Sequence, residues 1–542
     1  MSRPRAARVP VLDRSQAAAR DAILASGHHV VHGAPGTGKT QTALAAFTAA
    51  LGSKNLGEAV LLVPTRQRAA LVRDEVARRL DRTTGSILVR TPASLAFSIL
   101  RLRASHLGEP APTLITGPEQ DQVLAELIAG HLEGEGTTIE WPDAVGRATL
   151  GLRAFRDELR ELLMRAAEAG LDGTELARWG EQHERPEWRA AGQLLAEYTD
   201  VTLLGQLTPD RGARYDAATI VDEAVLALRT WERTVGAHPR PRWSFVVHDD
   251  YQDATLATAR LLDAMVDDGA RLALFGDPDV AVQAFRGGVP ALMHTATLPA
   301  GRQDGAWEAR SHVLSQVWRH PEGLRRVIRE LSDTLPTMQE IDRRRAQARD
   351  DGAGVSPSVD AAPVRTVVLA SPAQEVAYIA RALREHHLHA RVPWSAMAVI
   401  VRSGAELGAI RRGLRTAGVP LTMAAPDRPL REEPGVRPLL VALACVLSPR
   451  VGSEAGTELL LSPLGGLDAV SLRSLRRVLR QEERATGGER HSDDLLGEAL
   501  VDPARTATLP PRYRRAPQAV ARVLAAGRAA LDEEGSSVET VL

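Results

Sequence analysis

The chain has 542 residues, of which 44% are hydrophobic and 25% charged, and its formal net charge is −1. These values are typical of an ordinary soluble globular protein, and the length suggests roughly three or four domains. No apolar run approaches the ~18 residues of a membrane span, and a single cysteine (Cys445) excludes a disulfide framework. The near-zero charge excludes binding of nucleic acid by overall charge. We therefore expect a cytoplasmic protein whose nucleic-acid contacts, if any, lie in a local basic groove.

A glycine-rich loop near the N-terminus carries the strongest chemical signal. It fits the pattern G-x-x-x-x-G-K-[ST] without a mismatch, between an expected strand (residues 29–32) and a helical pattern (residues 41–50). Glycines let the backbone wrap an anion, and the N-terminus of the following helix attracts it. We expect Lys39 to reach the β- and γ-phosphates of a nucleotide and the Thr40 hydroxyl to hold Mg²⁺. The loop consists of Gly33, Ala34, Pro35, Gly36, Thr37, Gly38, Lys39 and Thr40.

The alternative is a glycine-rich turn that matches the pattern by chance. The sequence contains only two lysines, Lys39 and Lys54, so nearly all of its 67 Lys+Arg are arginines. A compact ammonium at the position where a phosphate loop needs one, in a chain that otherwise uses arginine, argues against chance. We therefore predict a nucleotide site.

The first half of the chain alternates strand and helix patterns. Apolar segments at residues 59–65 and 86–91 run into polar turns and helices, which predicts a parallel α/β sheet with its ligand edge at the carboxyl ends of the strands. Residues 110–235 contain long amphipathic helices without a convincing strand, so we expect a helical insertion there. The sheet then returns with strands at residues 243–248 and 271–275.

Two adjacent carboxylates, Asp249 and Asp250, follow the expected strand at residues 243–248. In Mg²⁺–nucleotide chemistry one carboxylate holds the metal shell, and its neighbour orients or deprotonates the attacking water. The alternative is a strand that ends in a solvated acidic turn. The phosphate loop favours the functional interpretation, so both residues are assigned to the candidate site.

The second half of the chain repeats the α/β pattern and then becomes helical. Residues 341–365 are rich in Arg, Asp, Ala, Gly, Ser and Pro and are predicted to be a solvated, disordered excursion. Strands are expected at residues 365–370, 397–402 and 419–423, with helices between them. From about residue 430 onward the pattern is helical, interrupted by a polar loop at residues 484–516.

The set and order of these motifs resembles the superfamily-one DNA helicases of the UvrD, PcrA, Rep and RecB type. Among these the chain is most similar to the AdnA subunits of actinobacterial AdnAB helicase–nucleases, and its preference for arginine over lysine fits a high-GC genome. The resemblance covers nearly the whole chain. It implies an α/β fold of RecA-like parallel-sheet P-loop motor domains with α-helical insertions, ATP and Mg²⁺ as cofactors, and DNA as a partner.

The resemblance also implies a division into domains. A first motor domain is expected from residues 1–110 together with 236–310, and a helical insertion from 111–235. A partial second motor domain is expected at 311–430, followed by a second, truncated helical insertion at 431–542.

Roles for individual residues follow from the same resemblance. Trp318 stacks on adenine, and Arg319 is an arginine finger delivered from the second motor domain, which accelerates related NTPases by about 10³–10⁵. Asp249 coordinates Mg²⁺ through water, and Gln252 links the nucleotide to the DNA track. Gln16 contacts adenine, although by itself it is better explained as a polar residue of a surface helix. The residues along the single-stranded DNA track are Thr65, Arg66, Thr91, Ser94 and the base-stacking Phe285.

The chain departs from the family pattern at four places. Asp250 stands where the family has glutamate, and a misplacement on the order of 1 Å costs roughly 10²-fold in rate. Val280 replaces a glutamine that senses the γ-phosphate, and Gln283 replaces an aromatic residue. The sequence ends at Leu542 before two further motor motifs, so we expect an incomplete or split protein rather than a natural shortened subunit.

The sequence thus predicts an ATP-dependent 3′–5′ DNA helicase motor of DNA repair or recombination, without its last motifs. The alternative is a weak or inactive ATPase that serves as a DNA-binding scaffold subunit in a helicase–nuclease heterodimer, which Asp250, Val280 and Gln283 favour. A third hypothesis is a P-loop NTPase unrelated to DNA. The Thr/Ser strand ends and the Trp318-Arg319 pair disfavour it.

Overall fold

The computed structural model divides into two compact units, Met1–Thr366 and Val367–Leu542, and each is described by itself. No helix among the described residues is long and apolar enough to cross a membrane. The described residues are 10–52, 58–80, 88–206, 213–216, 219–336, 341–348, 364–422, 435–448, 451–502, 506–507 and 509–532.

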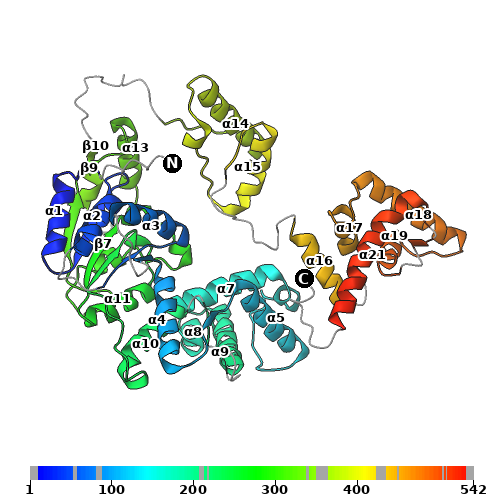
Figure 1. Cartoon of the computed structure of the whole chain (residues 1–542), viewed down its shortest axis with the longest axis horizontal. Coiled ribbons are helices and arrows are strands. Elements are labelled where there is room, and N and C mark those ends of the chain that lie inside the picture. Colours follow the sequence, from blue (N-terminus) through cyan, green and yellow to red (C-terminus); the bar gives the residue numbers. More distant parts are fainter. Residues whose placement is uncertain are drawn as a thin grey trace. The chain divides into compact units, whose positions relative to one another are not determined.

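A six-stranded parallel sheet forms the centre of the first unit, with the strand order β3-β2-β6-β7-β1-β8 (Figure 1). Most of its strand residues are buried, as expected of a parallel sheet covered by helices on both faces. The predicted α/β fold class is confirmed. The strands are β1 His29–Gly33, β2 Ala59–Leu62, β3 Val89–Arg90, β6 Phe245–His248, β7 Arg271–Gly276 and β8 Arg310–Leu314.

Helices cover the two faces of this sheet and close two separate cores. Val30 and Val31 are neighbours in β1, yet they belong to different cores, because successive strand side chains point to opposite faces. Helices α1 Arg14–Ala25, α2 Lys39–Gly52 and α3 Arg66–Leu80 cover the face of Val31. The face of Val30 is covered by α4 Pro92–Leu107, α10 Ile220–Thr234 and α11 Leu256–Asp267.

The arrangement gathers the chemistry at one edge. Because the strands are parallel, the segments that leave β1, β2, β3, β6 and β7 all emerge at the carboxyl edge of the sheet. The phosphate loop follows β1, and the Asp249-Asp250 pair follows β6. Short elements shape the remaining turns: η1 Tyr251–Asp253, η2 Pro278–Val280, η3 Ala284–Arg286 and α12 Leu292–Thr295.

A helical insertion lies between β3 and β6 in the chain and has its own apolar core. Helices were predicted in this region, and the structure forms them. It also contains a parallel pair of two-residue strands, β4 Thr113–Leu114 and β5 Arg214–Tyr215, where no strand was predicted. Two residues are too few to give a sequence period. The helices are α5 Gly117–Glu133, α6 Arg147–Leu150, α7 Arg153–Glu168, α8 Gly173–Gln182 and α9 Pro186–Gln206.

The described residues between β8 and residue 348 belong to the first unit, and two short strands among them, β9 and β10, pair with each other in a separate parallel sheet. The predicted boundary between the motor domains at residues 310 and 311 falls inside β8. The prediction of a solvated excursion at residues 341–365 is wrong for its first part, because Arg343 is fully buried, while residues 349–363 lie outside the described residues. The elements of this part are β9 Gln316–Val317, α13 Glu322–Asp333, η4 Ile341–Arg345 and β10 Gln347–Ala348.

In the second unit, the predicted α/β pattern forms its helices but not its strands. The described residues of the three expected strands are not paired in any sheet. Val368 and Ile400 are 93% and 94% exposed. An apolar run indicates an extended, buried segment only where neighbouring strands complete the hydrogen bonds, so the pattern alone was insufficient. The elements are α14 Pro372–Leu388, η5 Trp394–Ala396 and α15 Gly404–Thr416.

The C-terminal helices of this unit share one apolar core. Helical structure was expected after residue 430, and it forms. The predicted polar loop at residues 484–516 is wrong in part, because it contains helix α19, which buries Leu495 and Leu496. The helices are α16 Arg437–Leu447, α17 Ser453–Leu461, α18 Ala469–Ala485, α19 Ser492–Ala499 and α21 Pro511–Leu531.

Helices α8 and α9 of the insertion approach closely through glycines, which yields a stability prediction. A Cβ on Gly192 would lie 2.5 Å from both the backbone N of Ala177 and the carbonyl O of Gly173. Alanine normally stabilises a helix interior relative to glycine by about 1 kcal/mol. We expect Gly192→Ala to destabilise the protein by about 1–3 kcal/mol instead, because backbone atoms cannot yield.

The matched control is Gly130→Ala in α5, where the nearest atom to the new methyl group is 3.8 Å away. This change is expected to be neutral or to stabilise by about 0.5–1 kcal/mol. Urea unfolding of the two variants measures both effects. Equal stabilisation by the two substitutions would contradict the close helix contact.

Candidate functional site

The phosphate loop connects β1 to α2 in a conformation that glycine favours. Gly36 and Gly38 have φ angles of +82° and +83°, in the left-handed region that side chains with a Cβ rarely adopt. The Thr37 hydroxyl donates to the Ala34 carbonyl at 2.8 Å, which closes the turn. The loop runs directly into the N-terminus of α2, where free N–H groups and the helix dipole favour an anion.

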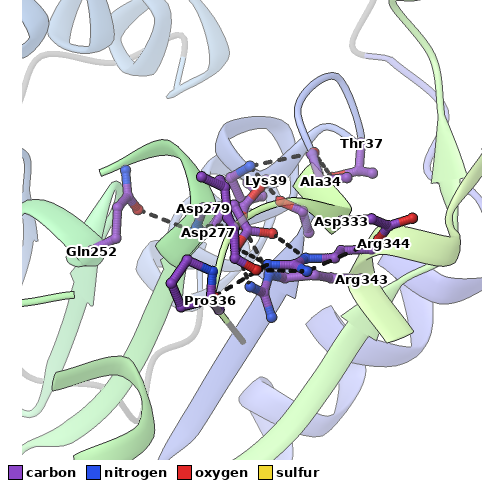
Figure 2. A network of polar contacts seen from close by, with 12 residues as sticks. Ala34, Thr37, Lys39, Gln252, Asp277, Asp279, Asp333, Pro336, Arg343 and Arg344 are labelled. Carbon is purple, nitrogen blue, oxygen red and sulfur yellow. Dashed lines mark hydrogen bonds and ion pairs between the residues drawn. The ribbon is translucent and has the colours of Figure 1, made fainter. Parts of the chain in front are cut away.

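Lys39 lies against its own loop. Its Nζ donates to the carbonyl of Gly33 at 2.6 Å and to that of Ala34 at 3.4 Å (Figure 2). Burial lowers the pKa of the Lys39 ammonium; nearby carboxylates, Asp277 foremost, oppose this shift, and Arg319 adds to it. An anion in the loop would offer this ammonium a stronger partner than a neutral carbonyl.

Thr40 and Asp249 meet at the edge of the sheet. The Thr40 hydroxyl donates to Asp249 Oδ2 at 2.6 Å. Asp249 is buried, and its other oxygen, Oδ1, has no hydrogen-bond partner among the described residues. Burial, together with the neighbouring Asp250, raises the pKa of Asp249. A hydroxyl and a carboxylate with a spare buried oxygen fit the oxygen ligands that Mg²⁺ prefers.

An arginine that the sequence analysis did not select bridges these groups. Arg68 Nη2 donates to Thr40 Oγ1 at 2.7 Å and lies 3.3 Å from Asp249 Oδ2, and its Nε lies 3.6 Å from Asp250 Oδ2. Asp250 itself has φ +56°, a left-handed conformation that is uncommon for a residue with a side chain. No sequence signal marks Arg68, because it is one of five arginines in α3.

The two predicted adenine-contact residues lie directly beside the loop. The Gln16 side chain donates through Nε2 to the Thr37 carbonyl at 2.8 Å and accepts from the backbone N–H of Asp13 at 3.0 Å. Trp318 donates through Nε1 to Asp13 at 2.9 Å and through its backbone N–H to the Gly36 carbonyl at 2.9 Å. The Trp318 side of the loop is accessible, since this residue is 39% exposed.

Arg319 also lies beside the loop. A Cβ on Gly36 would be 3.1 Å from the Cβ of Arg319, so the two backbones are in close contact. The resemblance implied an arginine delivered from a second motor domain, but here Arg319 belongs to the first unit. The reason is that Arg319 follows β9, which begins two residues after the end of β8, and the bond from the Trp318 backbone N–H to the Gly36 carbonyl holds this segment against the loop.

A buried charge network fastens η4 to the turn that follows β7 (Figure 2). Arg343 donates to Asp277 at 2.9 Å and to Asp279 at 2.7 Å, and Arg344 makes two further bonds of 2.7 Å to Asp279. Although burial opposes it, these bonds hold the pKa of Asp279 below its usual value. Gln252 joins the same turn by accepting from the backbone N–H of Asp277 at 3.1 Å.

A cavity of 380 Å³, a volume within the range of ligand pockets, lies at the carboxyl edge of the sheet beside His248, the neighbour of Asp249. It is lined by residues that follow β2, β3 and β6 and by helix α7 of the insertion. Three predicted DNA-track residues, Thr65, Arg66 and Thr91, line it. Ser94 and Phe285 do not; Ser94 donates its N–H to Thr91 Oγ1, and Phe285 is 67% exposed beneath the guanidinium of Arg286.

Two titratable groups of this cavity were missed by the sequence analysis. Burial raises the pKa of Glu168 to about 7, outweighing the opposite effect of Arg165, whose Nη1 is 3.0 Å away. Burial lowers the pKa of His248 to about 4. His248 Nδ1 lies 3.0 Å from the Asp249 carbonyl, so the floor of the cavity is one residue from the candidate metal site.

The comparison with protein families agrees with this geometry. The family description of the UvrD/REP helicase N-terminal domain matches residues 12–298, which is 287 of 542 residues and thus more than half of the chain. The chain belongs to the UvrD/REP helicase family. A search of curated proteins finds no match. Family membership implies a helicase-type motor that uses ATP with Mg²⁺.

The arginine network yields a second prediction. Arg343→Met removes one partner from two buried carboxylates, and breaking a buried pair in this way costs about 3–5 kcal/mol. We expect a large fall in the thermal unfolding midpoint of the first unit. Arg345→Met is the control, because Arg345 lies in the same η4 segment but pairs with Asp342 at the surface. Equal midpoints for the two variants would contradict a stabilising role of the network.

Proposed function

We propose that the chain is an ATP-dependent 3′–5′ translocase or helicase motor that acts on single-stranded DNA in DNA repair or recombination. The observation that carries the proposal is the shared edge of the sheet. Asp249 is hydrogen-bonded to Thr40 of the loop, and its neighbour His248 lines the cavity that Thr65 and Thr91 also line. A change at the nucleotide site can therefore alter the shape of the cavity through the end of β6.

In this proposal Thr40 and Asp249 would hold Mg²⁺, which would neutralise charge on the phosphates of the nucleotide. Lys39 leaves the Gly33 carbonyl for the phosphates, because a charge-assisted bond is stronger than a bond to a neutral acceptor. Asp250 orients the attacking water, and Arg319 stabilises charge on the transferred group. Trp318 and Gln16 contact the adenine from the other side of the loop.

The cavity is assigned to the DNA. Arg66, Arg165 and Arg286 line it and provide cations for phosphates, while Thr65 and Thr91 mark the strand ends along which the DNA runs. Exchange of the nucleotide alters the edge and thereby shifts the population of conformations that grip the DNA. The direction of travel and the role in repair rest on the resemblance to UvrD-type helicases.

A second candidate, a weak or inactive ATPase that acts as a DNA-binding scaffold subunit of a helicase–nuclease heterodimer, is favoured by Asp250 and Val280. Asp250 is a short carboxylate in a left-handed backbone conformation, paired with Arg68. Val280 has an apolar side chain where a γ-phosphate contact is expected. Under this candidate, Asp250→Glu combined with Val280→Gln raises turnover, whereas the motor proposal requires turnover without these changes.

The motor proposal predicts ATP hydrolysis that single-stranded DNA stimulates. Lys39→Ala should reduce kcat by about 10²-fold or more, because a preorganised charge on the transferring group is lost. Lys54→Ala, a change of the only other lysine, should leave it unaffected. Steady-state phosphate release with and without a single-stranded oligonucleotide measures this. If the unchanged protein hydrolyses ATP no faster than Lys39→Ala, with or without DNA, the motor proposal is contradicted and the scaffold candidate is favoured.

The assignment of the cavity to DNA predicts a pH dependence. The Glu168 carboxyl, with its raised pKa of about 7, is ionised above that pH and repels phosphates. Affinity for single-stranded DNA should therefore rise as the pH falls through about 7. Glu168→Gln should tighten binding at pH 8 by about two- to fivefold, equivalent to about 0.5–1 kcal/mol, and should flatten the profile.

Glu158→Gln is the matched control, because Glu158 is on the same helix but exposed and outside the cavity. It makes the same change in charge and should leave the pH profile unaltered. Fluorescence anisotropy with a labelled oligonucleotide from pH 6 to 8 measures all three proteins. If the two glutamine variants show the same dependence of DNA affinity on pH, the assignment of this cavity to DNA is contradicted.

A further inference from the structure

Arg68 makes contacts that place it on the candidate metal ligands. Its Nη2 is 2.7 Å from Thr40 Oγ1 and 3.3 Å from Asp249 Oδ2, and its Nε is 3.6 Å from Asp250 Oδ2. These three groups are the hydroxyl and the two carboxylates on which Mg²⁺ chemistry at this edge depends. A single guanidinium thus faces all of them.

A guanidinium in this position competes with a metal ion. Mg²⁺ requires oxygen ligands at about 2.0–2.1 Å in near-octahedral geometry, so it cannot share Thr40 and Asp249 with Arg68 as these groups now lie. The competition is also electrostatic. Arg68 compensates the charge of Asp249 and Asp250, while Lys39 is bonded to backbone carbonyls. A free divalent ion gains less at a site that already holds a cation.

The side chain of Arg68 is able to leave. It is 36% exposed, so its displacement toward solvent or toward an incoming phosphate does not bury the guanidinium, but it leaves the buried Asp249 without this cation unless another takes its place. A Mg²⁺–nucleotide complex differs from free Mg²⁺ in bringing anionic oxygens that both complete the metal shell and offer the guanidinium a new partner. Only the complex therefore brings both a cation for the carboxylates that Arg68 leaves and an anionic partner for the Arg68 guanidinium.

We propose that Arg68 is a positioning residue that acts as an internal counter-ion of the metal site, so that the site selects the Mg²⁺–nucleotide complex over the free divalent ion. The inference rests on the proposed ATP site. It also links that site to the cavity. Arg68 lies in the first turn of α3, and its backbone N–H donates to Thr65 Oγ1 at 3.1 Å, directly beside the cavity residue Arg66. The turn that carries Arg68 thus also contacts a residue of the expected DNA track.

The test measures binding of Mn²⁺, a spectroscopic substitute for Mg²⁺, by electron paramagnetic resonance without any nucleotide. Arg68→Gln keeps a polar side chain and removes the charge, so the affinity for free Mn²⁺ should rise by on the order of tenfold. Arg78→Gln is the control, because Arg78 lies on the same helix and pairs with Glu75 away from the site. It should bind Mn²⁺ as the unchanged protein does.

Two further variants localise the effect. Asp249→Asn in the Arg68→Gln background should abolish the gain, which separates this site from acidic surface patches. Arg68→Lys keeps a cation and should bind Mn²⁺ weakly, like the unchanged protein, which guards against a folding defect in Arg68→Gln. Thermal unfolding of each variant accompanies the titrations.

The outcomes separate this inference from the proposed function. Equal or weaker Mn²⁺ binding by Arg68→Gln, with normal Mn²⁺–ADP binding by the unchanged protein, overturns the role of Arg68 alone. Failure of the unchanged protein to bind Mn²⁺–ADP overturns both the ATP site and the inference. A tenfold gain that disappears with Asp249→Asn supports both.

Discussion

Asp249 is a buried carboxylate at the end of a central strand, and the structure around it depends on how its charge is compensated. One oxygen is bonded to Thr40 and Arg68, and the other has no partner among the described residues. This unpaired oxygen supports the proposal that Asp249 belongs to a ligand site, because a structural ion pair would use both oxygens within the protein. The Thr40 contact ties β6 to the loop after β1, and the Arg68 contact ties it to α3.

Buried carboxylates also follow β7, but there their charges are fully compensated within the protein. Asp277 and Asp279 are fully engaged by Arg343 and Arg344, both of which are buried. This part of the edge is a structural joint, because all its charges are paired within the protein. The two neighbouring strand ends thus differ. Asp249 after β6 has an unpaired oxygen, which we assign to the proposed ligand, whereas Asp277 and Asp279 after β7 are paired with arginines of η4.

The sequence predicted those features that depend on local patterns. The buried strands and the phosphate loop were recognisable because apolar runs and glycine spacing are properties of contiguous residues, and the loop forms with Gly36 and Gly38 in the left-handed region. The meeting of Thr40 with Asp249, 209 positions apart, is contained in no local pattern; it was anticipated because both residues follow strands of one predicted parallel sheet, and through the resemblance to a family. Arg68 and Arg343 could not be selected, because an arginine-rich sequence gives no indication of which arginines are buried against carboxylates.

The unpaired segments of the second unit show a different limit. Apolar runs at residues 365–370 and 397–402 met the criteria of strands, yet Val368 and Ile400 are exposed. A strand is defined by hydrogen bonds to neighbours, which no local pattern contains. Helices α14 and α15 formed as predicted, because a helix satisfies its own backbone.

The central claim is that the loop, Thr40 and Asp249 form one Mg²⁺–nucleotide site whose internal cations exchange partners when it is filled. A crystal structure with Mg²⁺ and a non-hydrolysable ATP analogue tests this most directly. We expect phosphates in the loop, Mg²⁺ beside Thr40 and Asp249, Lys39 Nζ moved from the Gly33 carbonyl to the phosphates, and the Arg68 guanidinium displaced from Thr40. An analogue bound elsewhere, with Lys39 and Arg68 in their present contacts, would contradict it.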